Sequence, residues 1–243
     1  MSDIIEGRNP VIEALKADRE IEKILIAKGA DNGSAKKIIA MSKDKGIPLQ
    51  YVEKQFMDKQ SIGAAHQGVI AYVSAYEYAE IEDIVFKAKE KNEDLFVIIL
   101  DSIEDPHNLG AVIRSADAAG AHGVIIPKRR AAGLTSVAVK ASAGAVEYVP
   151  VVRVPNLIYA IKQLKDLGVW VAAADMEGEE LFSANMTGKI ALVIGNEGKG
   201  ISKLLKETCD FTVKLPMLGK IESLNASAAA AVLMYEVVRQ RSK

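Results

Sequence analysis

Residues 95–127 read LFVIILDSIEDPHNLGAVIRSADAAGAHGVIIP, and this stretch decides the fold class. It begins and ends on short, almost wholly apolar runs, and between them lies a segment of small residues, 110–120, with helical character. Uninterrupted apolar runs of strand length are typical of a sheet that is covered on both faces. Because parallel neighbours need a crossover connection, usually a helix, the stretch predicts a strand, a helix and a strand of a parallel sheet.

The rest of the C-terminal part repeats this pattern. Four more apolar runs of strand length follow, at 148–154, 169–174, 190–195 and 210–215. Helical segments separate them, and the chain ends on an Ala-rich helix over 227–241. The sequence therefore predicts an α/β fold with a parallel, doubly wound sheet.

The N-terminal part gives shorter signals that alternate between helix and strand. Asn9 and Pro10 are expected to open the first helix as its cap and first-turn residue. The signals predict a small α/β domain, with helices at 11–17, 34–46 and 53–61 and strands at 21–27, 48–52 and 68–74. Residues 77–92 then combine charged side chains with apolar positions at helical spacing. The predicted organisation is a domain over 1–76, a linker helix within 77–92 and a second domain over 93–243.

Composition and charge exclude several functional classes. Of the 243 residues, 49% are hydrophobic and 26% charged, so the chain is not disordered. Its 31 basic and 32 acidic side chains nearly balance, and any nucleic-acid site must be a local basic patch. A single cysteine, Cys209, excludes a disulfide framework, and three scattered histidines lack the spacing of a metal site. With no signal peptide and no apolar run that could cross a bilayer, we expect a cytoplasmic protein without membrane contact.

Three loops that follow predicted strands carry polar residues suited to binding, because ligands of such sheets lie beyond the carboxyl ends of the strands. In the first loop, Asn108 lies near a helix start and Arg114 lies one turn inside the helix. Asn108 can either cap the helix or face a ligand. Arg114 lies among small apolar residues, where its charge either needs a partner or extends to solvent.

The second and third loops leave similar alternatives. Residues 192–202, LVIGNEGKGIS, match neither the dinucleotide fingerprint nor a Walker A loop, so NAD and ATP are not indicated. This loop either offers Glu197 and its backbone to a ligand or is a plain Gly-rich turn. In the third loop, Ser223 and Asn225 precede the Ala-rich helix, where capping needs only one of them. The Ala run indicates close packing against another helix or a second subunit.

Together the three loops resemble the three motifs of the SpoU-type RNA ribose 2'-O-methyltransferases, the TrmH family of the SPOUT superfamily. The first motif, D-x-x-x-D-P-x-N-x-G-x-x-x-R, is met by Asp101, Asp105, Pro106, Asn108, Gly110 and Arg114. The second, G-x-E-x-x-G, is met by Gly195, Glu197 and Gly200. The third is met by Pro216, Met217, Gly219, Ser223, Leu224 and Asn225. The resemblance covers residues 95–243, and residues 6–15 and 66–73 resemble that family's L30e-like substrate-binding module.

The resemblance implies a C-terminal deep trefoil knot whose loops bind S-adenosylmethionine. The cofactor positions that it implies are Ala174, Asp175, Gly195, Asn196, Gly198, Gly200, Leu215, Met217 and Leu224. It implies a catalytic set of Arg114, Asn108, Glu197, Ser223 and Asn225, in which Arg114 is often the general base. A guanidinium is effectively never deprotonated in proteins. Clamping the target phosphate or the incipient alkoxide is therefore the easier role for Arg114.

The substrate that the resemblance implies is RNA, most closely a guanosine in a 23S rRNA loop, with a tRNA ribose as the alternative. Phosphate contacts are expected from Arg8 and from the run Lys128, Arg129 and Arg130, for which the alternative is a solvated loop. A two-fold homodimer is expected, and no metal is. Two rival interpretations are a non-catalytic RNA-binding protein and an enzyme of the same superfamily that methylates a base.

Overall fold

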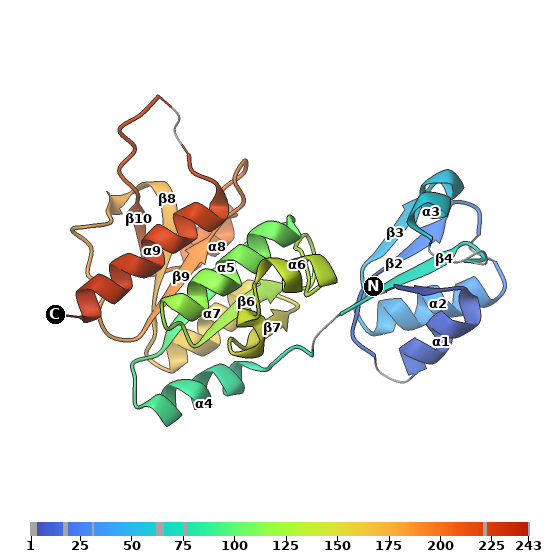
Figure 1. Cartoon of the computed structure of the whole chain (residues 1–243), viewed down its shortest axis with the longest axis horizontal. Coiled ribbons are helices and arrows are strands. Elements are labelled where there is room, and N and C mark those ends of the chain that lie inside the picture. Colours follow the sequence, from blue (N-terminus) through green and yellow to red (C-terminus); the bar gives the residue numbers. More distant parts are fainter. Residues whose placement is uncertain are drawn as a thin grey trace. The chain divides into compact units, whose positions relative to one another are not determined.

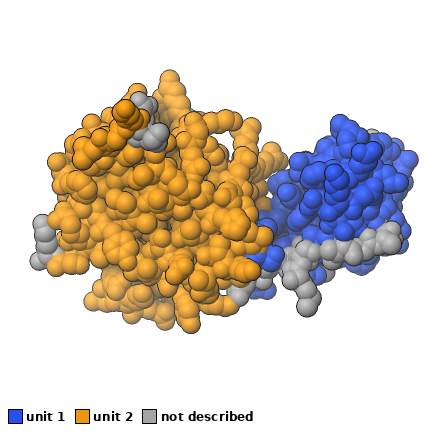
Figure 2. Space-filling view, turned by 45° about the horizontal axis from the view of Figure 1, so that its top comes forward, with its two compact units in different colours: residues 1–77, 133–136 blue, residues 78–132, 137–243 orange. Residues whose placement is uncertain are grey.

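The chain divides into two compact units, which Figure 2 colours separately. The computed structural model describes residues 4–16, 19–30, 32–61, 66–74, 77–220 and 223–242. The first unit comprises residues 1–77 together with 133–136, and the second comprises 78–132 together with 137–243. Each unit has its own hydrophobic core.

The first unit is a mixed four-stranded sheet with helices on both faces. Its elements are β1 (Ile4–Glu6), α1 (Arg8–Lys16), β2 (Ile21–Ala27), α2 (Ser34–Asp44), β3 (Leu49–Val52), α3 (Lys54–Gln60) and β4 (Val69–Val73). The strand order is β1-β4-β2-β3, with β2 parallel to β3 and β4 antiparallel to β1 and β2. Helices α1 and α2 bury Val11, Leu15 and Ile38 against one face of the sheet, and α3 buries Met57 against the other. The predicted small α/β domain is thereby confirmed.

Two details of the first unit differ from the sequence predictions. Strand β1 was not predicted, because three residues are too few to display an alternating pattern. Helix α1 begins at Arg8, so Asn9 and Pro10 both lie inside its first turn and Asn9 does not cap it. Pro10 remains tolerated there because the first helical N–H groups have no intrahelical acceptor.

The second unit is a six-stranded parallel sheet between two layers of helices (Figure 1). Its strands are β5 (Phe96–Leu100), β6 (Gly123–Pro127), β7 (Val151–Val154), β8 (Trp170–Glu180), β9 (Ile190–Ile194) and β10 (Phe211–Lys214). Its helices are α4 (Ile81–Lys91), α5 (Pro106–Ala118), α6 (Ser136–Ala141), the 3-10 turn η1 (Ala145–Glu147), α7 (Leu157–Asp166), α8 (Lys203–Thr208) and α9 (Ala226–Arg241). Every strand pair is parallel, which confirms the predicted doubly wound sheet.

Alternate residues of the central strands serve the two helical layers. Val97 and Ile99 of β5 share a core with residues of α4, α7 and α8. Helix α5 packs against α9 in the opposite layer, and the interleaved residue Ile98 is also fully buried. Burial on both faces explains why β5 is apolar at every position.

Helix α4, which lies within the segment 77–92, belongs to the core of the second unit. Ile81, Ile84 and Ala88 are buried there, on the sheet side of the helix. The helix starts with a capping box between Glu80 and Asp83 and ends at Asn92 in the left-handed conformation. Because these side chains lie in the second core, α4 is a structural part of the unit that follows it.

The direction of the chain across the sheet reverses between β5 and β9. The strand order is β10-β8-β9-β5-β6-β7, so the chain first adds β6 and β7 on one side of β5 and then fills the other side. The carboxyl ends of β5 and β9 meet, since Leu100 pairs with Ile194 and the Asp101 amide donates to the Ile194 carbonyl at 2.8 Å. In open α/β sheets, ligands bind in the crevice at such a reversal.

Three residues of the first motif have structural roles. The Asp105 carboxylate caps α5 by accepting from the His107 amide at 2.9 Å, and Pro106 is the first helical residue. Gly110 allows α5 to approach α6 closely, because a Cβ there would lie 2.4 Å from the Ala138 carbonyl oxygen. These residues fix the start of α5, and therefore the position of Asn108.

Candidate active site

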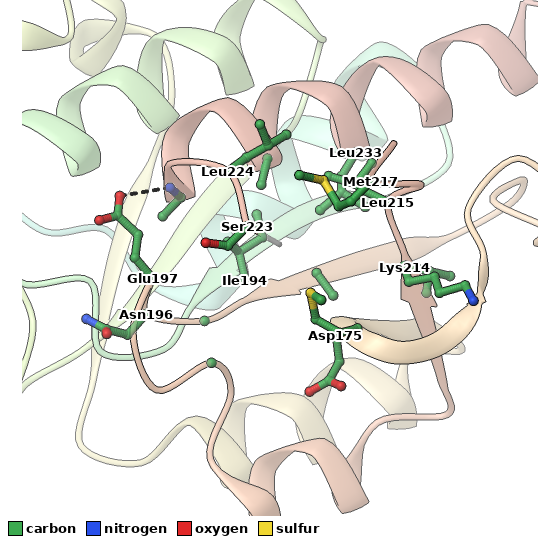
Figure 3. Close-up of a pocket in the computed structure, with 17 residues that line it drawn as sticks. Asp175, Ile194, Asn196, Glu197, Lys214, Leu215, Met217, Ser223, Leu224 and Leu233 are labelled. Carbon is green, nitrogen blue, oxygen red and sulfur yellow. Dashed lines mark hydrogen bonds between the residues drawn. The ribbon is translucent and has the colours of Figure 1, made fainter. Parts of the chain in front are cut away.

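A pocket lies at the carboxyl ends of β9 and β10 and beside the middle of β8, and the first turns of α9 form one of its walls (Figure 3). The space in and around it, including the solvent at its open mouth, is roughly 790 Å³. The lining is mostly apolar and consists of Ala174, Asp175, Met176, Ile194, Gly195, Asn196, Glu197, Gly200, Val213, Lys214, Leu215, Met217, Ser223, Leu224, Ala226, Ala229 and Leu233.

The pocket brings together the cofactor positions that the sequence predicted, with one exception. Gly195, Asn196 and Gly200 follow β9, and Leu215, Met217 and Leu224 follow β10. Ala174 and Asp175 lie within β8, directly after Ala173, its last residue paired with β9, and not in a loop after the strand as the family resemblance implied. Gly198 does not line the pocket. Its amide donates to the Asn196 side-chain oxygen at 2.9 Å, so its place is in the turn that shapes the loop.

Sequence reasoning missed several lining residues. Leu233 lies two turns inside α9, and Figure 3 places its side chain beside those of Leu215 and Met217. Lys214 belongs to the last position of β10, and its ammonium pairs with Glu180 at 3.2 Å. Neither carries a motif signal, because an apolar helix residue and a strand-end lysine are common in any fold. Leu233 and Lys214 are recognised as pocket residues only once the structure shows α9 packed across the strand ends.

The Gly-rich loop after β9 folds back on itself tightly. The backbones of Asn196 and Gly200 exchange two hydrogen bonds, of 3.2 and 2.8 Å. Gly195 lies directly under this closure, and a Cβ there would be 2.3 Å from the Gly200 carbonyl carbon. Gly200 has a φ of 64°, which favours glycine. The loop is therefore a defined wall of the pocket.

Glu197 is the centre of a polar network that joins the three motif loops. One of its oxygens accepts from the Asn225 amide at 2.6 Å, from the Asn108 amide at 3.1 Å and from the Ala226 backbone N–H at 2.9 Å. Asn225 also donates to the Asn108 side-chain oxygen at 3.0 Å. Figure 3 shows Glu197 reaching toward the start of α9. Residues 117 positions apart in the chain thus meet at one point beside the pocket.

The third loop shows how the capping alternative is resolved. The Asn225 side-chain oxygen caps α9 by accepting from the Ser227 and Ala228 amides, while its nitrogen serves the Glu197 network. Ser223 takes no part in capping and lines the pocket instead. Both residues have separate uses, in agreement with the observation that one cap needs only one of them.

Arg114 is exposed and lies outside the pocket of its own chain. It is in the third turn of α5, in line with Gly110 four residues earlier. Among the residues that the structure describes, none forms an ion pair or hydrogen bond with its guanidinium. The structure brings Asn108, Glu197, Ser223 and Asn225 to the pocket or its network, and it leaves Arg114 available to a partner from outside the chain.

Acidic groups near the pocket are partly neutralised by lysine. The Asp175 carboxylate accepts from the Glu177 amide at 3.1 Å and pairs with the Lys206 ammonium at 3.2 Å. Hydrogen bonds to Glu177 and then to Asp175 raise the pKa of Lys206 above its ordinary value. Asp175 is thereby held in place at the pocket wall by contacts on both of its oxygens.

The basic run after β6 lies near the end of β5. The Ala132 amide donates to the Ile103 carbonyl at 2.7 Å, which ties the loop to the first motif. Arg129 and Arg130 are exposed, and Arg130 has a φ of 55°, an uncommon conformation for a residue with a side chain. The Lys128 carbonyl accepts from Arg153 at 3.3 Å. RNA binding by this run stays a prediction.

Arg8 has a structural role in the first unit. Its guanidinium donates to the carbonyls of Ala30, Asn32 and Gln67 at 3.1 to 3.3 Å. The bond to Gln67 joins the EGRNP stretch to the HQG stretch, the two segments that carry the N-terminal resemblance. A contact between Arg8 and RNA stays a prediction.

Other reactive groups do not form a second site. Burial raises the pKa of the Cys209 thiol to about 12, so the thiol is not a nucleophile at neutral pH. Across the described ranges, no cluster of three or more His, Cys, Asp or Glu residues has a metal-binding arrangement. Within the same part of the chain, no helix is both long enough and apolar enough to cross a membrane.

Comparison with protein families matches both parts of the chain. Residues 95–235 match the SpoU rRNA Methylase family. Residues 4–79 match the family described as RNA 2'-O ribose methyltransferase substrate binding. Residues 80–94, which contain α4, lie between the two matches.

Similar proteins are found among both sequences and structures. YacO of Bacillus subtilis (strain 168), which is named as a TrmH-family tRNA/rRNA methyltransferase, is 52% identical over 242 residues, or 99% of this chain and 96% of YacO. The SpoU methyltransferase AviRb of Streptomyces viridochromogenes, solved with the cofactor AdoMet, is 27% identical, with a TM-score of 0.62 over 98% of this chain and 90% of AviRb. A structure described as an RNA 2'-O ribose methyltransferase is also 27% identical, with a TM-score of 0.56 over 99% of this chain and 89% of the other.

Proposed function

Because the chain belongs to the SpoU rRNA methylase family, we propose that it transfers a methyl group from S-adenosylmethionine to a ribose 2'-hydroxyl of RNA in the cytoplasm. One observation carries the proposal: the Glu197 network joins all three family motifs at the rim of a pocket suited to the cofactor. A catalytic unit and a substrate-binding unit on the same chain support RNA as the substrate.

The residues of the pocket fit S-adenosylmethionine. Leu215, Met217, Leu224 and Leu233 offer an apolar surface for the adenine ring. The tight loop at Gly195 exposes backbone to the ligand because no side chain can stand there. Asp175, held at the wall, is a carboxylate for the cationic end of the ligand. The knot that the family resemblance implies stays a prediction.

The reaction requires the 2'-oxygen, the methyl carbon and the sulfur to be in line. S-adenosylmethionine supplies an activated methyl group on a sulfonium. With the cofactor bound, the methyl group would pass from the sulfur to the 2'-oxygen, leaving a neutral thioether, and the hydroxyl proton would pass to a phosphate oxygen or water. In this proposal Asn108, Asn225 and Ser223 orient the ribose, and Glu197 holds the two amides in place. Such orientation removes much of the entropic barrier to a reaction between two bound molecules.

We propose a guanosine in a loop of 23S rRNA as the target, with a tRNA ribose as the second candidate. A single ribose is selectable only where its nucleotide is accessible, in a loop or bulge. The name of the relative YacO covers both tRNA and rRNA. Mapping 2'-O-methylation across total RNA of a deletion strain decides between them. We expect one rRNA mark to disappear, and loss of a tRNA mark with every rRNA mark intact contradicts the rRNA assignment.

The two units have different roles in this proposal. Residues 1–76 bind RNA, 77–92 connect the domains and 93–243 catalyse the reaction. Because α4 buries Ile81, Ile84 and Ala88 in the second core, a catalytic fragment must begin before it, at about residue 78. The exposed lysines on α2, Lys36, Lys37 and Lys43, suit a phosphate-facing surface of the first unit.

Neutralising the basic run is expected to weaken RNA binding and to flatten its salt dependence. In the triple variant Lys128→Ala, Arg129→Ala, Arg130→Ala, the slope of log K against log salt falls by about 2 to 3 if all three contact phosphates. Binding is measured by fluorescence anisotropy between low and moderate salt. A matched control removes Lys91, Lys162 and Lys203, which are exposed on α4, α7 and α8. An equal effect of both triples would show that only net charge matters.

We further propose a two-fold homodimer that uses the outer side of α9. Val232 and Tyr235 are 41% and 52% exposed on this helix although its sequence is largely apolar. In a dimer, the same helix of a second copy would cover Val232 and Tyr235 and remove them from water. Tyr235→Lys is expected to shift the protein to monomer in sedimentation velocity. Tyr159→Lys, which changes a tyrosine 70% exposed on α7, should remain dimeric. A monomeric wild-type protein contradicts the dimer.

A further inference from the structure

Asp101 is a buried carboxylate of the first motif that the proposed chemistry does not use. It follows β5 directly, is 8% exposed and does not line the pocket. A buried carboxylate is costly unless hydrogen bonds compensate for lost water. The partners of Asp101 therefore indicate what the residue is for.

Both oxygens of Asp101 have partners, and one partner lies on another loop. Oδ2 accepts from the Ser202 backbone N–H at 2.9 Å, and Oδ1 accepts from the Ser102 hydroxyl at 3.0 Å. Ser202 is 101 positions away and directly follows the Gly-rich loop, residues 195–201. The Asp101 carboxylate therefore fixes the far end of that loop.

The start of the Gly-rich loop, at Asn196, is hydrogen-bonded to Ser102, the residue after Asp101. The Asn196 side-chain nitrogen donates to the Ser102 carbonyl at 3.0 Å, and Ser102 has a φ of 61°, a conformation that residues with side chains seldom adopt. Non-glycine residues in this region persist only where their surroundings hold them, and they cluster at functional sites. Residues 101 and 102 together hold both ends of the loop.

We infer that Asp101 is a positioning residue that holds the loop 195–201 in the conformation required for cofactor binding. This loop supplies Gly195, Asn196 and Gly200 to the pocket and Glu197 to the polar network. Ile201 anchors its end in the core of the second unit. Releasing Ser202 frees the loop to open around that anchor, and the pocket wall and the network both lose their geometry. The inference rests on the proposed function for the identity of the cofactor.

The test compares Asp101→Ala with a matched loss of another carboxylate. Asp210 also accepts from a backbone amide, that of Val171 at 2.8 Å, and its side chain is 19% exposed. It precedes β10, at the opposite end of the strands from the pocket. Asp210→Ala therefore loses a similar hydrogen bond in the same unit, together with an ion pair to Lys165 at 2.7 Å, without touching the loop. Asp101→Asn keeps an oxygen that can accept from Ser202 and serves as the conservative variant.

Two readouts separate positioning from general stability. Isothermal calorimetry gives the affinity for S-adenosylmethionine of the full chain, and hydrogen exchange reports opening of residues 195–201 without any ligand. We expect Asp101→Ala to weaken cofactor binding by about tenfold or more and to speed exchange in the loop, with Asp101→Asn between it and the wild type. Asp210→Ala should lower the thermal midpoint but change the cofactor affinity by less than about twofold.

The inference about Asp101 can be overturned by either readout. Unchanged loop exchange in Asp101→Ala or Asp101→Asn overturns the inference, as does an equal loss of affinity in Asp210→Ala. If Asp101→Ala does not fold, Asp101→Asn carries both measurements. A wild-type protein that fails to bind S-adenosylmethionine, with faster loop exchange in the Asp101 variants, refutes the proposed function and leaves the loop assignment standing.

Discussion

Arg114→Ala is expected to lower the rate of methyl transfer by at least about a hundredfold while leaving the affinity for S-adenosylmethionine within a few fold. The reason is the position of Arg114, which is exposed on α5 and outside the cofactor pocket of its own chain. A guanidinium there can act on the RNA phosphate or on the developing 2'-alkoxide, and it is not among the residues that line the pocket of its own chain. Single-turnover methylation and calorimetry measure the two quantities separately.

Arg114→Lys distinguishes charge from geometry at the same position. Lysine keeps the positive charge but lacks the planar fork that binds a phosphate through two parallel hydrogen bonds. We expect a rate between those of the wild type and Arg114→Ala. Near-wild-type turnover of Arg114→Ala contradicts the proposed action of Arg114 on the RNA. A loss of cofactor affinity as large as the loss of rate would instead indicate that Arg114 acts in cofactor binding.

Gly195→Ala is expected to abolish measurable binding of S-adenosylmethionine. An added Cβ would lie 2.3 Å from the Gly200 carbonyl carbon and 2.4 Å from the Ile201 nitrogen, and backbone atoms cannot move aside as a side chain can. The loop has to open, which displaces the pocket wall and Glu197 together. Calorimetry on the purified variant measures the binding, and circular dichroism confirms that it is folded.

Gly198→Ala is the matched variant in the same loop. A Cβ at this position meets only the Asn196 side-chain oxygen, at 3.6 Å, which is ordinary contact. We expect the affinity for S-adenosylmethionine to stay within a few fold of the wild type. If Gly195→Ala binds normally, or if both variants lose binding alike, the close approach at Gly195 is not what the pocket needs.

The sheet was predictable because its strands carry their signal locally. Runs such as 95–100 and 190–195 are apolar at every position, and only a strand buried on both faces requires that. Other elements lack such a signal. Helix α6 is six residues long and was not predicted. Strand β8 continues through the mostly polar residues 175–180, where Glu179 and Glu180 pair with Val213 and Lys214 of β10. The order of strands depends on packing between distant segments, which no local pattern contains.

The family resemblance named several residues that the structure brings together, but no pattern in the sequence showed how they are connected. The motif resemblance named Asn108, Glu197 and Asn225, and the structure joins them through a single carboxylate oxygen. The third donor to this oxygen is the backbone of Ala226, which no side-chain pattern identifies. Arg8 illustrates the converse case, because a positive charge in the sequence predicted a phosphate contact and the structure shows three backbone carbonyls around it.

Nucleoside analysis of methylated RNA tests the central claim most directly. Total RNA from a deletion strain is incubated with the purified protein and S-adenosylmethionine that carries a labelled methyl group, digested to nucleosides and separated by mass spectrometry. We predict that the label is recovered in a nucleoside methylated at the ribose 2'-oxygen, with an unmodified base. Label on a base contradicts ribose methylation, and unlabelled RNA from a protein that binds the cofactor contradicts the assignment as an RNA methyltransferase.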